Sequence, residues 1–131
     1  MSRFVRPQTR TLRLENGDRL IVRERLTAGE LRAMFARVYT PGSGGRLEAT
    51  PFMSGVGTVL AYLLDWDLTD DAGAPVVIRD LSTADLQQVI DSLDQESFLE
   101  IKTAIESHVV AMAELREQEK KTAGEKLSLV T

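Results

Sequence analysis

The side chains best suited to catalysis or metal binding lie in one acidic segment of the chain and at one histidine. Four carboxylates, Asp65, Asp67, Asp70 and Asp71, are spaced closely enough to suggest a divalent cation, since Ca²⁺ and Mg²⁺ prefer oxygen ligands. A calcium-binding loop, however, requires a central glycine and a terminal bidentate glutamate. Gly73 comes too late in this segment, and no glutamate follows at the required distance. The spacing therefore favours a solvated acidic turn over a metal-dependent hydrolase.

His108 is the only histidine in the chain and is a conceivable general base or metal ligand. General-base catalysis needs a nucleophile or a second titratable group within hydrogen-bond reach, and no sequence motif pairs one with His108. The chain has no cysteine, which excludes disulfides and thiolate metal sites. We therefore expect a partly buried structural histidine, no enzymatic activity, no metal and no cofactor.

The glycine-rich segment Thr40-Pro41-Gly42-Ser43-Gly44-Gly45 invites comparison with phosphate-binding loops. It lacks the Lys-Ser/Thr ending of a P-loop and the spacing of a dinucleotide-binding fingerprint, and a predicted helix rather than a strand precedes it. We expect residues 40–50 to form a flexible loop that serves as a linker or becomes ordered on a partner.

The elements that position these residues begin with a β-hairpin. Residues 11–14 and 19–23 flank the dipeptide Asn16-Gly17, which favours a type I′ turn. One face of the hairpin is apolar. A lone hairpin is marginal in water, so this face must dock on helices or on another chain. Its apolar residues are Leu12, Leu14, Leu20 and Val22.

Three predicted helices have recognisable N-terminal caps. Thr27-Ala28-Gly29-Glu30 forms a capping box, and the helix after it runs to about Tyr39. Ser82 and Asp94 suit the N-cap positions of two later helices, of which the second is the longest. Residues 122–131 are expected to form a mobile tail beyond it. The apolar stripe of the first helix comprises Leu31, Met34, Phe35 and Val38.

A further helix is predicted between the glycine-rich segment and the acidic segment. Thr50 and Pro51 suit its N-cap and first helical position, and it continues through Leu64. It is apolar on most sides, which predicts a buried central helix. Gly55 and Gly57 each cost about 1 kcal/mol relative to alanine in an exposed helix, which indicates the close approach of another backbone.

The longest helix carries a hydrophobic seam with 3-4-3-4-3 spacing, too short to indicate a coiled coil by itself. Trp66 is expected to anchor the core, and its indole N–H requires a hydrogen-bond acceptor. Trp66 and most of the seam are candidates for a partner-binding groove, and the alternative is that they fill the core. These candidate residues are Trp66, Phe98, Ile101, Ile105, His108 and Met112, with Leu115 completing the seam.

Length and composition are those of a small globular protein. The 131 residues suit a single domain with a mainly helical α+β fold, about four helices and an N-terminal β-hairpin. We expect a basic arm and hairpin over residues 1–26 and a helical body over residues 27–121. No apolar run approaches the length of a membrane span and no secretory signal is recognisable, so a soluble cytoplasmic protein is expected.

Charge is divided unevenly along the chain. Residues 1–46 hold ten arginines and four acidic residues, a net charge of +6, whereas the remainder carries −10, and the total is −4. A basic N-terminal third could bind nucleic acid through phosphates. No aromatic stacking platform or groove-reading helix accompanies it, so we expect the arginines to complement acidic groups of the same molecule or of a neighbour.

One block of sequence resembles a known family. An apolar helix leads into Leu64-Asp65-Trp66-Asp67-Leu68 and then Asp71-Ala72-Gly73-Ala74-Pro75. Leu93-Asp94-Gln95-Glu96-Ser97-Phe98 and a helix with Ile101, Ile105 and His108 follow. This arrangement resembles the tail assembly chaperones of long-tailed bacteriophages and related prophages. With the N-terminal hairpin, the resemblance covers nearly the whole chain.

The resemblance implies a non-catalytic protein of the bacterial host cytoplasm. Such chaperones keep the long, helical tape-measure protein soluble and help to recruit tail-tube subunits, so both are implied partners. We also expect a homo-oligomer. The alternatives are a structural tail or connector subunit of a phage particle and, less favoured, an arginine-rich nucleic-acid-binding regulator.

Overall fold

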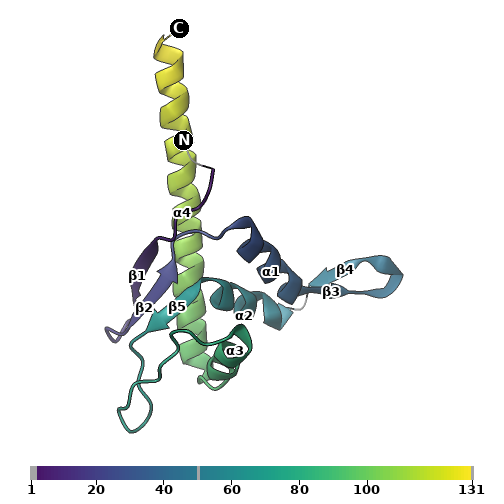
Figure 1. The fold of residues 1–131 in the computed structure, drawn as a ribbon, viewed down its shortest axis with the longest axis vertical. Coiled ribbons are helices and arrows are strands. Elements are labelled where there is room, and N and C mark those ends of the chain that lie inside the picture. The colour runs from purple at the N-terminus through teal and green to yellow at the C-terminus, as the bar shows by residue number, and fades with distance from the viewer. Residues whose placement is uncertain (1–2, 50, 131) are drawn as a thin grey trace.

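A three-stranded antiparallel sheet and four α-helices make up most of the described residues, 3–49 and 51–130 of this computed structural model (Figure 1). The strand order in the sheet is β1-β2-β5. The prediction of a mainly helical α+β fold with an N-terminal hairpin is confirmed. The long helix α4 spans the molecule, and its C-terminal part extends well beyond the body (Figure 1).

The N-terminal hairpin consists of β1 (Thr9–Arg13) and β2 (Arg19–Arg23), with Leu12 opposite Leu20. The predicted type I′ turn is wrong. Among the residues described, only Gly17 in this turn has a positive φ, at 90°, and the Gly17 N–H donates to the Leu14 carbonyl oxygen at 3.0 Å. This is the pattern of a three-residue loop closed by a glycine in the left-handed region. The Asn16 side chain favours this loop because its Oδ1 accepts a hydrogen bond from the Asp18 N–H.

The third strand was not expected from the sequence. Helix α2 (Pro51–Tyr62) ends before Leu64, and β5 (Leu63–Trp66) pairs with β2 so that Trp66 lies opposite Leu20. Thr50, the predicted N-cap of α2, lies outside the described residues. A short apolar run does not reveal by itself whether it is helical or extended. Here the free edge of β2 supplies backbone hydrogen-bond partners, so residues 63–66 form a strand instead of the end of the helix.

A second hairpin replaces the flexible loop expected over residues 40–50. After α1 (Ala28–Val38), β3 (Tyr39–Pro41) pairs with β4 (Leu47–Ala49), and a short 3₁₀ turn (Ser43–Gly45) connects them. Gly44 and Gly45 have φ values of 78° and 76°, which glycine adopts without steric cost. The glycines thus close a turn between strands, and this hairpin projects from the body beside α1 (Figure 1).

Helices α3 (Thr83–Asp91) and α4 (Gln95–Val130) begin at the predicted caps. Ser82 accepts from the Asp85 N–H, and Asp94 accepts from the Ser97 N–H. The expected tail over residues 122–131 is instead largely helical, because Gly124 does not adopt the left-handed conformation that ends many helices. Even so, no helix in the described part of the chain has a stretch both long and apolar enough to cross a membrane.

The core lies between the sheet and the helices, and α2 contacts α1, α3 and α4. The prediction of a buried central helix is confirmed. The expected close approach of another backbone is found at Gly57, where the Met34 carbonyl oxygen of α1 would lie 3.7 Å from a β-carbon, although side chains lie nearest to both glycines. A β-carbon at Gly57 would lie 2.9 Å from Val38 Cγ2, and one at Gly55 would meet the side chain of Lys102. The buried core residues are Leu20, Val22, Val59, Leu60, Leu63, Trp66, Ile78, Leu86, Ile90, Ile101 and Ile105.

Candidate functional site

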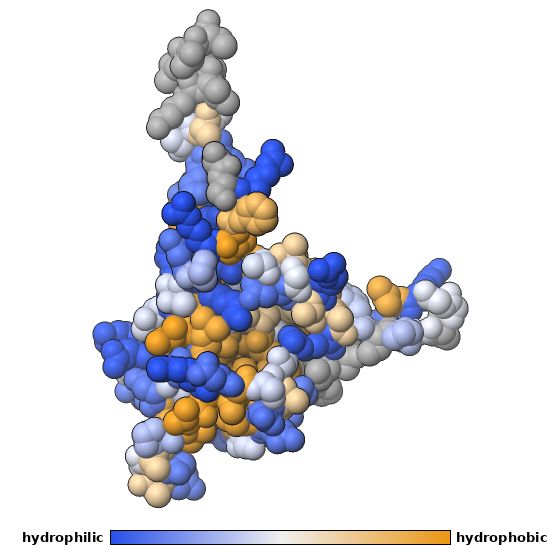
Figure 2. Space-filling model, viewed as in Figure 1, coloured by the Kyte–Doolittle hydropathy of each residue, from blue (hydrophilic) through white to orange (hydrophobic). Residues whose placement is uncertain are grey.

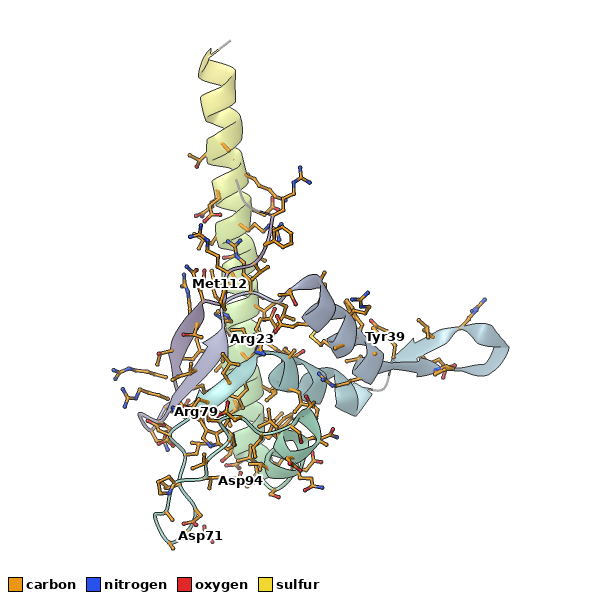
Figure 3. All side chains as sticks on the ribbon, in the orientation of Figure 1. Arg23, Tyr39, Asp71, Arg79, Asp94 and Met112 are labelled. Atoms are coloured by element: carbon orange, nitrogen blue, oxygen red, sulfur yellow. The ribbon has the colours of Figure 1, made fainter. Side chains whose placement is uncertain are left out.

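The residues predicted to form a partner-binding groove face the interior of the protein. Ile101 and Ile105 are almost completely buried in the core cluster, and Met112 is buried where α4 leaves the body (Figure 3). Phe98 packs against the same cluster and is partly buried. The seam of α4 therefore holds the helix in the core. Of the six candidate residues, five are buried and Phe98 is partly buried.

His108 joins α4 to the sheet. Its Nε2 lies 2.9 Å from the carbonyl oxygen of Arg23, and it is buried. A carbonyl oxygen can only accept, so Nε2 carries the proton in this contact. The ring of Tyr62 packs edge-on against the imidazole at 6.0 Å, and burial, with a smaller effect of Glu30, raises the pKa of the Tyr62 hydroxyl. This geometry suits the structural role predicted for His108.

Trp66 is a core anchor with a satisfied indole. It is buried, and its Nε1–H donates to the carbonyl oxygen of Val76 at 2.7 Å. This hydrogen bond fixes the segment after β5 against the sheet, and Ile78 follows Val76 into the core. The sequence predicted both the burial and the need for an acceptor.

Replacement of Trp66 by phenylalanine is expected to lower the free energy of unfolding by about 2 kcal/mol. Phenylalanine keeps most of the apolar surface but leaves the Val76 carbonyl without its donor, a loss of about 1–3 kcal/mol for a buried group. Urea unfolding followed by far-UV circular dichroism measures the change. The exposed Tyr39→Phe variant is the control and should unfold with the wild type. Equal stabilities of Trp66→Phe and wild type would contradict this role.

The carboxylates of the acidic segment bind groups of the same chain. Asp65 accepts from Arg79 Nη2 at 2.6 Å, and Asp67 accepts from the Arg19 N–H at 2.6 Å. Asp70 Oδ1 accepts two backbone N–H groups within its own turn. Asp71 lies on the loop that projects from the body (Figure 3). In the described residues, no three carboxylate or histidine side chains gather as metal ligands would.

The Asp65–Arg79 pair predicts a specific pH dependence. The hydrogen bond from Arg79 lowers the pKa of Asp65 below its ordinary value of 3.8. A lowered folded-state pKa adds stability that is present above the unfolded-state pKa and is lost as the pH falls through the folded-state pKa. Asp65→Asn should therefore be less stable than wild type at pH 7, and the difference should shrink in acid. Urea unfolding at a series of pH values tests this, and a pH-independent difference would contradict it.

One exposed apolar surface lies on α1 and the second hairpin. Leu31, Phe35 and Tyr39 follow one another at intervals of four residues and are 41%, 46% and 39% exposed. Residues four apart are neighbours on a helix surface, and the rings of Phe35 and Tyr39 are 5.8 Å apart. The predicted apolar stripe of this helix is thus divided: Val38 is buried, while Leu31 and Phe35 remain exposed.

The strand register extends this surface onto the hairpin. Tyr39 pairs with Ala49, and Pro41 pairs with Leu47. Directly opposed residues share a face of a sheet, as do alternate residues of a strand, so Leu47 lies on the same face as Tyr39. Leu47 is 71% exposed. We call Leu31, Phe35, Tyr39 and Leu47 the α1–hairpin surface. Tyr39 marks its centre at the junction of α1 and the hairpin (Figure 3), and hydrophobic atoms are visible on the projecting hairpin (Figure 2).

Comparisons with protein-family models, with curated proteins and with solved structures find no match. The α1–hairpin surface is the candidate site, because exposed apolar side chains that include aromatic rings are typical of a protein-binding surface.

Proposed function

We propose that this protein is a non-catalytic tail assembly chaperone of a long-tailed bacteriophage or prophage. Its client is the tape-measure protein, and the α1–hairpin surface is the contact site. The observation that carries the proposal is this exposed surface, built from Leu31, Phe35, Tyr39 and Leu47 on the outer side of α1 and on the projecting hairpin. The resemblance of the acidic segment and the α4 seam to this family supports the choice of client.

The chemistry of the surface suits a helical client. An amphipathic helix binds by laying its apolar positions, spaced at i, i+3, i+4 and i+7, against an apolar surface of its partner. Phe35 and Tyr39 offer aromatic anchors with few rotatable bonds, so ordering them on binding costs little entropy. A long client whose helices expose apolar faces would otherwise aggregate. Covering those faces keeps it soluble until the tail-tube protein, the second proposed partner, assembles around it in the bacterial cytoplasm.

Co-expression with a candidate tape-measure protein tests the proposal. The client alone is expected to be mainly insoluble. With the chaperone present, most of it should become soluble and co-purify. A client that stays insoluble, or becomes soluble without binding the chaperone, would contradict the proposal. We propose that the chaperone acts as a homo-oligomer, which light scattering of the purified protein would test.

A structural tail or connector subunit is the second candidate function. The projecting β3–β4 hairpin favours it, because an exposed two-stranded element can extend a sheet of a neighbouring subunit. The two functions differ in the finished particle. A structural subunit remains in purified virions, whereas a chaperone is released during assembly. Immunoblotting of purified particles therefore separates them.

A further inference from the structure

Seven of the ten N-terminal arginines fall into two groups, and Arg3, Arg6 and Arg13 belong to neither. Four of them form ion pairs within the molecule: Arg10 with Glu24, Arg19 with Asp67, Arg23 with Glu30, and Arg25 with Glu119. These pairs use carboxylates of the same chain, as the uneven charge distribution led us to expect. They account for only part of the excess positive charge.

The second group lies on the two elements that carry the candidate site. Arg32 and Arg37 lie on α1, and Arg46 directly precedes Leu47 on the hairpin. The ion pairs among the described residues include none of these three arginines. Across α1 and the hairpin, the only carboxylate besides the paired Glu30 is Glu48. The segment that carries the exposed apolar residues is therefore positively charged.

Arg32 is the closest of these charges to the apolar residues. It follows Leu31 and lies one turn before Phe35, so a helix of 3.6 residues per turn places it along the exposed border of the stripe. Its guanidinium lies over the first turn of α1, where Nη2 would be 3.9 Å from a β-carbon at Gly29. Arg46 is the sequence neighbour of the exposed Leu47, whereas Arg37 lies two residues after Phe35, about 200° around the helix and so away from the stripe.

We infer that the α1–hairpin surface recognises an amphipathic client helix whose apolar stripe is flanked by carboxylates. This inference rests on the proposed function and adds the chemical class of the segment recognised. The apolar residues bind the stripe of the client, and the arginines bind and orient its acidic border. Charges at the rim of an interface contribute chiefly to specificity and association rate. The aliphatic and aromatic centre of the surface suits a protein helix better than the phosphates of a nucleic acid.

Two synthetic helical peptides test this inference. Both carry the same leucine stripe over 21 residues, and the positions beside it are glutamate in one peptide and lysine in the other. Fluorescence anisotropy with the full-length protein is expected to give about tenfold tighter binding of the glutamate peptide at physiological salt. The preference should decrease in high salt. Equal affinities, or tighter binding of the lysine peptide, would overturn the inference.

Two charge-reversal variants, one at the surface and one away from it, provide a matched pair for this test. Arg32→Glu/Arg46→Glu should reverse the peptide preference, whereas Arg13→Glu/Arg116→Glu makes the same change in net charge elsewhere and should keep it. Duplex DNA is a further probe, and binding as tight as that of the glutamate peptide would overturn the inference. A variant of this surface that changes the oligomeric state of the protein but leaves peptide binding unaltered would also overturn the inference. In that case a second copy of the chain, rather than a client helix, would occupy the surface.

The inference and the proposed function fail in different ways. If the tape-measure protein is solubilised and the peptides show no charge preference, the inference is wrong and the chaperone function stands. If the peptides show the preference and the tape-measure protein is not solubilised, the surface recognises an acidic helix and the proposed client is wrong.

Discussion

Replacement of Ile105 by alanine is expected to lower the free energy of unfolding by about 4 kcal/mol, within the range of about 2–5 for buried aliphatic truncations. Ile105 is completely buried in the core cluster that α4 forms with the sheet and α2. Truncation removes apolar surface from the core and leaves a cavity that the surrounding strands cannot readily fill. A single domain is stable by only about 5–15 kcal/mol, so this substitution removes a large share of the total.

Urea unfolding followed by far-UV circular dichroism measures this effect. Val110→Ala is the matched control, because Val110 lies on the same helix and is 57% exposed. The control should change stability by less than about 0.5 kcal/mol, as is usual for surface positions. A small effect of Ile105→Ala, similar to that of Val110→Ala, would mean that the seam of α4 is not the core of the folded protein.

Replacement of Phe35 by glutamate is expected to abolish solubilisation of the tape-measure protein and leave the fold intact. The substitution places a carboxylate at the centre of the α1–hairpin surface, where binding of an apolar client face would have to desolvate it. It also removes the ring that packs 5.8 Å from Tyr39. Aromatic residues at the centre of an interface commonly contribute about 2 kcal/mol or more, which corresponds to at least about a 30-fold loss of affinity.

Leu99→Glu is the control for this prediction. Leu99 lies on α4, and its exposed fraction of 46% equals that of Phe35. Both variants should have thermal unfolding midpoints close to that of the wild type, and only Phe35→Glu should lose the client. If both variants keep the client soluble, the α1–hairpin surface is not the binding site. If only Leu99→Glu loses it, the contact lies on the outer face of α4.

The α4 seam shows both the strength and the limit of sequence periodicity. The spacing of Phe98, Ile101 and Ile105 correctly identifies one apolar face of a long helix. It does not determine whether that face covers the protein's own sheet or a partner. The same limit applies to α1, whose stripe includes the buried Val38 and the exposed Phe35. Which part of an amphipathic stripe is covered depends on tertiary neighbours, and these are distant in the sequence.

The strands that the sequence did not reveal depend on pairing between segments. Leu63–Trp66 reads as the end of an apolar helix, and it becomes β5 because β2, some forty residues earlier, offers a free edge. The β3–β4 hairpin is short, and its glycines indicated a loop rather than a turn between strands. The capping box at Thr27 and the N-caps Ser82 and Asp94 were predicted correctly, because cap hydrogen bonds form within a few residues of the chain.

Hydroxyl-radical footprinting of the protein, free and bound to the proposed tape-measure client, tests the central claim most directly. In the free protein, Phe35 and Tyr39 should be oxidised readily, whereas Trp66 and Met112 should be protected by burial. Binding of the client should protect Phe35, Tyr39 and Leu47 and leave the oxidation of Trp66 and Met112 unchanged. Unchanged oxidation of Phe35 and Tyr39 in the complex, with protection confined to α4, would contradict the account.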